Sequence, residues 1–170
     1  MKSIFKAVAT ITIFSVITRA LGFFFRIFLS RKLGAEGVGL FQMASSVLGI
    51  FMTLVSSGIP LTTAKLVSKY EVNNELKKRN QVVSSALVIA MTIAVISSLL
   101  IFALKYVWGI VLTDSRAVEL LIIMIPSIVF SAIYAVFRGA MWGQNDYFNC
   151  GLTELLEQII RFALTFIMLF

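Results

Sequence analysis

The chain has 170 residues, of which 59% are hydrophobic and only 14% are charged, and its mean hydropathy is +0.98. Soluble domains are about 45–50% apolar and about 25% charged, so this composition argues against a soluble domain and is typical of a membrane protein. The net charge is +7, but the charges lie between apolar stretches. Membrane orientation and anionic lipid explain them better there than nucleic acid does.

The residues that usually carry enzyme chemistry are scarce. The chain has no histidine and a single cysteine, Cys150, which excludes an intrachain disulfide and removes the commonest metal ligand. It also shows no glycine-rich phosphate loop and no nucleophile with an identifiable base. We therefore expect no catalytic site, no metal and no cofactor.

Long runs without a formal charge divide the chain. The two longest hold 28 residues between Glu36 and Lys65, and 25 between Arg79 and Lys105. A helix needs roughly 20 mostly apolar residues to cross a bilayer, and backbone in lipid must satisfy its own hydrogen bonds. We therefore predict an all-α, multi-pass transmembrane helical bundle in a single domain, with about five spans at residues 7–29, 38–64, 82–104, 119–137 and 151–170.

The distribution of Lys and Arg predicts how the chain is oriented. We interpret the N-terminal MKSIFKAV as part of a retained first span, because no small-residue cleavage site follows a short apolar core. With the N-terminus in the cytoplasm, the cytoplasmic segments hold eight Lys and Arg residues and the outer segments hold four. The positive-inside rule favours this orientation. The polar stretch at about 65–81 is then a cytoplasmic loop.

The first predicted span contains charged residues within an apolar segment, RALGFFFRIFLSRKLG. Arg19, Gly22 and Arg26 have i, i+3, i+7 spacing, which places them on one helix face. Ionisable residues inside a membrane usually face a cavity or a bundle interior, which makes Arg19 a candidate for binding substrate. Arg26 fits a cavity or the outer interface about equally, since a long side chain can extend its charge to the interface.

The fifth predicted span has a comparable charged stripe. In TELLEQIIRFAL, Glu154, Glu157 and Arg161 again have i, i+3, i+7 spacing. One interpretation is structural: Glu157 pairs with Arg161 at i+4, or the acids pair with Arg19. The other is functional: the acids neutralise cavity arginines until an anionic substrate replaces them.

Two further features concern the second and the last span. In SSGIPLTTAKLVSKY, Gly58 and Pro60 predict a break or kink, which membrane helices tolerate where neighbours or a cavity satisfy the backbone. The last span ends on IMLF without a polar anchor. We therefore expect the chain to be truncated at its C-terminus.

Several stretches resemble a known family of transporters. TRALGFFFRIFLSRKLGAEGVGLF, SSGIPLTTAKLVSKY, RGAMWGQNDY and ELLEQIIRF follow one another over nearly the whole chain. Together they resemble the stage V sporulation protein B and polysaccharide-exporter branch of the multidrug/oligosaccharidyl-lipid/polysaccharide exporter superfamily. The resemblance implies a larger two-lobed fold with a central cavity and alternating access. It also implies that Arg19 and Arg26 contribute to a cationic cavity.

The resemblance and the charges together favour one function over two rivals. We expect a flippase segment that translocates a lipid-linked oligosaccharide or cell-wall precursor, with membrane lipid and an anionic lipid-linked sugar as its partners. Missing C-terminal helices or a partner chain would complete it. One rival is a cation-coupled multidrug exporter of the same superfamily, which needs buried carboxylates and finds them only at Glu154 and Glu157. The other is a truncated membrane protein that transports nothing.

Overall fold

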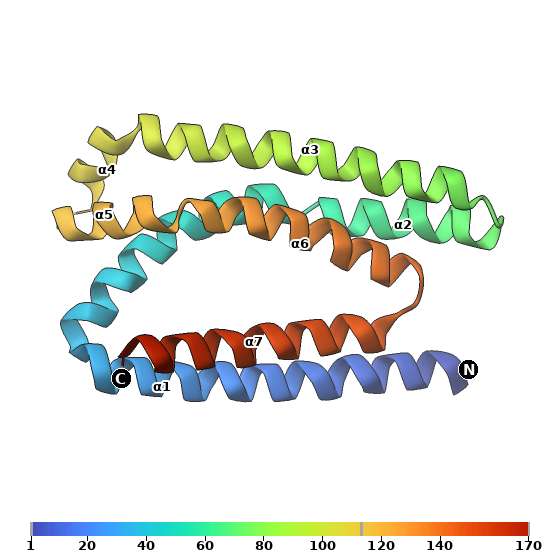
Figure 1. Ribbon diagram of the computed structural model, residues 1–170, viewed down its shortest axis with the longest axis horizontal. Helices are drawn as coiled ribbons and strands as arrows, with labels where there is room; N and C mark the ends of the chain where they lie inside the picture. Colours follow the sequence, from blue (N-terminus) through green and yellow to red (C-terminus); the bar gives the residue numbers. More distant parts are fainter. Residues whose placement is uncertain (1, 113, 170) are drawn as a thin grey trace. The chain divides into compact units, whose positions relative to one another are not determined.

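The chain folds into helices joined by short connections. The computed structural model describes the backbone of residues 2–112 and 114–169 and the side chains of residues 8–112 and 114–167. No strand occurs in these ranges, which confirms the all-α prediction. The helices, labelled in Figure 1, are α1 (Lys2–Ser56), α2 (Ile59–Val72), α3 (Leu76–Ala103), α4 (Lys105–Val111), α5 (Ser115–Met124), α6 (Pro126–Gly143) and α7 (Tyr147–Leu169).

The chain divides into two compact units. Unit 1 combines the described residues of Met1–Val38 with those of Asn145–Phe170, and unit 2 is Gly39–Gln144. Helix α1 belongs to both, and its one non-helical residue is Gly34, with a φ of +70°. Residues that carry a Cβ atom rarely adopt this left-handed backbone conformation, whereas glycine does so without steric cost. Glycine at this position therefore permits a kink close to the boundary between the units.

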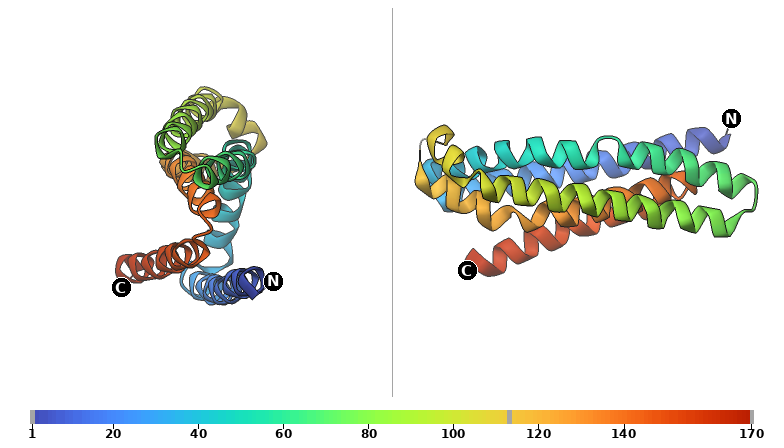
Figure 2. Two further views of the ribbon diagram at one scale, coloured as in Figure 1. Left: turned by 90° about the vertical axis from the view of Figure 1, so that its right-hand side faces the viewer. Right: turned by 90° about the horizontal axis from the view of Figure 1, so that it is seen from above.

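Unit 2 is built around three helices, α2, α3 and α6, which lie side by side (Figure 2). Its core consists of aliphatic side chains, of which Val55, Ile101 and Leu121 are fully buried. Glycines on α6 bring its backbone close to α2: a Cβ atom built on Gly139 would lie 2.6 Å from the carbonyl oxygen of Pro60. Small residues of this kind allow helices to pack closely in membranes. Close packing matters there because the hydrophobic effect contributes little to the association of helices in lipid.

By length and composition, two helical stretches of the described chain are suited to cross a membrane: Val8–Val72 and Leu76–Ala103. The pair Ser115–Met124 and Pro126–Gly143, bent by 40° between Met124 and Pro126, adds a third if it counts as one span. The 65-residue stretch would measure roughly 100 Å, against about 30 Å for the bilayer core, so it is long enough for both the first and second predicted spans. The positions of the five spans stay a prediction.

The helices extend further than the charge-free runs suggest. The predicted loop at 65–81 is mostly helical, because α2 continues to Val72 and α3 begins at Leu76. Lys, Glu and Arg are good helix formers, and hydropathy marks contact with lipid, not the end of a helix. Likewise Arg138, predicted to follow the fourth span in a cytoplasmic segment, lies within α6.

Candidate functional site

In unit 1, α7 packs against the N-terminal part of α1 through aromatic rings. The ring centroids of Phe14 and Phe148 lie 5.6 Å apart, and those of Phe25 and Phe162 lie 6.0 Å apart. The contacts follow the same order along both helices, so α7 runs parallel to this part of α1. At Gly151 an added Cβ atom would collide with the ring of Phe14, which shows how closely the two helices approach. This packing determines which face of α1 contacts α7 and which faces do not.

The arginines of α1 lie away from the face that packs on α7. Arg26 follows Phe25 by one residue, which turns its side chain about 100° from the ring contact, and Arg19 lies seven residues earlier on nearly the same face. Both are exposed, and within the described part of the chain neither forms an ion pair or a hydrogen bond. A Cβ atom on Gly22, between them, would find no atom within 4 Å. The face therefore presents two guanidinium groups beside an open backbone position.

The charged stripe of α7 pairs within its own helix. Arg161 donates from Nη2 to Oε1 of Glu157 over 2.6 Å, and both side chains are about half exposed. This is the i+4 pairing that the spacing allowed; Glu157 does not pair with Arg19. Glu154, on the same stripe, is half-buried. The structure thus brings Glu157 and Arg161 together and keeps Arg19 and Arg26 on a separate face of α1.

The helix break in the second predicted span lies at Ser57 and Gly58, between the end of α1 and the start of α2. Pro60 occupies the first turn of α2, where a missing N–H costs no intrahelical hydrogen bond. Gly58 is exposed, and a Cβ atom there would meet nothing within 4 Å.

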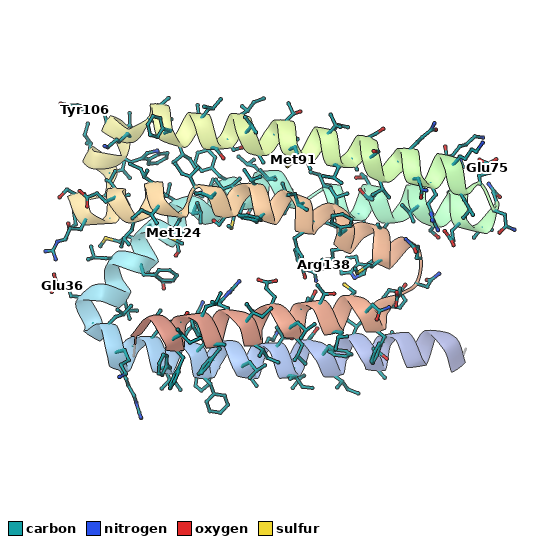
Figure 3. The ribbon with its side chains drawn as sticks, in the orientation of Figure 1. Glu36, Glu75, Met91, Tyr106, Met124 and Arg138 are labelled. Atoms are coloured by element: carbon teal, nitrogen blue, oxygen red, sulfur yellow. The ribbon has the colours of Figure 1, made fainter. Side chains whose placement is uncertain are left out.

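One of the eight Lys and Arg residues in the predicted cytoplasmic segments has a more specific environment. Arg138 on α6, labelled in Figure 3, is half-buried, and its guanidinium carbon lies 4.8 Å from the ring centroid of Trp142 and 6.0 Å from that of Tyr134. All three side chains stand on one helix face at i−4, i and i+4. Cation–π contacts of this type stabilise an arginine that is partly removed from water. The spacing of the aromatics around Arg138 was the signal that could have indicated this.

These features define the class of protein. Long apolar helices, close packing through glycine and exposed arginines within an apolar segment characterise a multi-pass membrane protein. The family described as polysaccharide biosynthesis protein matches residues 4–170, and the chain belongs to this family. The resemblance found in its motifs is thereby confirmed.

Three curated relatives come from Bacillus subtilis (strain 168). Stage V sporulation protein B is 30% identical over 150 residues, which cover 88% of this chain and 29% of the relative. Uncharacterized membrane protein YabM is 24% identical over 152 residues, covering 87% of this chain and 27% of the relative. Lipid II flippase MurJ is 21% identical over 160 residues, which cover 89% of this chain and 29% of the relative. The chain thus spans less than a third of the length of these relatives, and no solved structure matches it.

Proposed function

We propose that this chain is part of a flippase that moves a lipid-linked oligosaccharide or cell-wall precursor across a bacterial plasma membrane, with its N-terminus in the cytoplasm. The observation that carries the proposal is the pair of exposed arginines, Arg19 and Arg26, on one face of an apolar helix. A charge in hydrocarbon is costly, so such residues usually face a water-filled cavity or a substrate path. Membership of the polysaccharide biosynthesis family and similarity to a protein named lipid II flippase support the same function.

The chemistry of the two arginines suits an anionic cargo. Lipid-linked sugars of this class carry a pyrophosphate, and guanidinium groups bind phosphate oxygens through two parallel hydrogen bonds. Seven residues of helix separate Arg19 from Arg26 by roughly 10 Å along the axis, a gap that two long side chains can close around a diphosphate. The open position at Gly22 leaves room for the cargo to approach the backbone between them.

The charged stripe of α7 has a second role in this proposal. Glu157 already holds Arg161, so that base is neutralised without cargo. Glu154 and Glu157 then set the charge of the cavity, and Arg161 supplies a cation that is released only when an anion displaces Glu157. The stripe tunes the binding of an anion, while Arg19 and Arg26 provide most of the attraction.

Single arginine substitutions in the full-length protein test the proposal. We expect Arg19→Ala to slow the flipping of a fluorescent lipid pyrophosphate oligosaccharide in proteoliposomes by roughly 10- to 100-fold, because a charge-assisted hydrogen bond contributes about 1.5–3 kcal/mol. Arg19→Lys should retain part of the rate, since it keeps the charge and loses the bidentate geometry. Membrane insertion and yield should not change.

Arg31→Ala is the matched control, because Arg31 lies at the predicted outer interface and should leave the rate unchanged. A normal flipping rate in Arg19→Ala would exclude Arg19 from the cargo path. If activity instead requires a cation gradient and a cationic drug, the multidrug exporter is the better assignment.

A further inference from the structure

A groove of about 400 Å³ runs between α2 and α3 within unit 2. Its walls reach from Ile59 to Tyr70 on α2 and from Lys78 to Ile89 on α3. The eleven steps from the first to the last residue of each wall measure roughly 16 Å of helix, which equals about half the thickness of a bilayer's hydrocarbon core. The groove is therefore as long as one acyl chain within one leaflet.

The charged end of the groove lies beside the α2–α3 turn, and the rest of its lining is aliphatic apart from the hydroxyl groups of Thr62, Thr63 and Ser85. Tyr70, Lys78 and Gln81 line the end beside the α2–α3 turn, which Glu75 marks in Figure 3. Leu66 and Ile89 line its apolar part and are 43% and 56% exposed. A phospholipid has the same order of chemistry, a charged phosphate followed by a hydrocarbon chain.

Lys78 is the one charged residue among the described residues that line the groove, and the segment around it is basic. Between Lys65 and Arg79 the chain has five basic and two acidic residues, which gives a net charge of +3. Of the two acids, Glu71 is bound by Arg79 at 2.9 Å, and Glu75 is bound by Lys78 at 2.9 Å. The Lys78–Glu75 pair is exposed, and pairs of this kind contribute little to stability, so Lys78 can exchange its carboxylate for a phosphate at small cost.

We propose that this groove binds an anionic glycerophospholipid, with the phosphate at Lys78 and one acyl chain along Leu66 and Ile89. Basic pockets between membrane helices attract anionic head groups. A purely apolar occupant would leave Lys78 with Glu75 as its partner and gain nothing from the basic segment around it. The inference goes beyond the proposed transport function, because the lipid is a resident of the membrane and not the cargo. Loss of either property would leave the other intact.

Paired substitutions in the full-length protein distinguish the groove from general charge attraction. The delipidated protein is titrated with dioleoyl-phosphatidylglycerol or dioleoyl-phosphatidylcholine, and bound lipid is counted by native mass spectrometry. We expect one phosphatidylglycerol to bind more tightly than phosphatidylcholine, and Lys78→Glu to weaken it by roughly tenfold or more. Lys77→Glu, the same charge change on the neighbouring residue that does not line the groove, should weaken the affinity much less than Lys78→Glu does.

A second pair tests the apolar part of the groove without changing charge. Ile89→Trp should displace the bound lipid, whereas Val88→Trp, a change at another exposed aliphatic residue that lies outside the lining, should not. Equal effects of Lys77→Glu and Lys78→Glu, or an unaltered affinity in Ile89→Trp, would overturn the proposal. So would a photo-crosslinker at position 89 that reacts with another segment of the protein and not with lipid. Crosslinking to phosphatidylglycerol would support it.

Discussion

The close approach of α6 to α2 makes Gly139 a sharp test of how unit 2 is packed. We predict that Gly139→Ala destabilises the protein, although alanine favours a helix more than glycine does. The added methyl carbon would lie 2.6 Å from the carbonyl oxygen and 2.8 Å from the Cα atom of Pro60. These are backbone atoms, so no side-chain rotation can relieve the contact.

The magnitude follows from that geometry. An ordinary van der Waals contact begins at about 3.4 Å, so α2 and α6 must separate by roughly 0.8 Å at this point. Overpacking of this kind costs about 1–3 kcal/mol, and backbone on both sides places the cost in the upper half of that range. The helix propensity of alanine offsets about 1 kcal/mol. The expected net loss of stability is therefore about 1–2 kcal/mol.

The measurement is the midpoint of thermal unfolding of the full-length protein in detergent. Gly49→Ala is the matched control, because Gly49 lies inside a helix of the same unit and an added Cβ atom would meet nothing within 4 Å. It should keep or raise the midpoint, while Gly139→Ala lowers it. If Gly139→Ala unfolds at or above the wild-type midpoint, α2 and α6 do not approach as closely as described.

Gly34 and the contact of Arg138 with Trp142 give two independent predictions. Gly34→Ala should destabilise the protein by roughly 1–2 kcal/mol, because alanine at a φ of +70° is sterically strained; a raised thermal midpoint would argue against the left-handed kink. Trp142→Leu and Arg138→Gln should show a coupling of roughly 0.5–2 kcal/mol in a double-mutant cycle, since the guanidinium lies 4.8 Å from the indole; additive effects would mean that the contact contributes nothing.

The sequence predicted the helical class and the local pairs, but not the contacts between helices. Charge-free runs indicate which segments lie in lipid, and the i+4 spacing of Glu157 and Arg161 anticipated their ion pair. Helices α2 and α3 extend beyond the predicted spans because charged residues there remain helical once they reach water. The contact of Gly139 with Pro60 joins residues far apart in the chain, and no local pattern in a single sequence reveals it.

The arginines of α1 and α7 differ in whether their own helix supplies an acidic partner. Both helices carry guanidinium groups within apolar segments, where an unneutralised charge is costly. On α7 the charge of Arg161 is neutralised within the helix by Glu157, four residues earlier. On α1 the residues one turn away from Arg19 and Arg26 include no acid, and in the described ranges no other element supplies one. Whatever offsets the charge of Arg19 and Arg26 must therefore come from water, from other protein or from a bound anion, and an anionic cargo does so only while it is present.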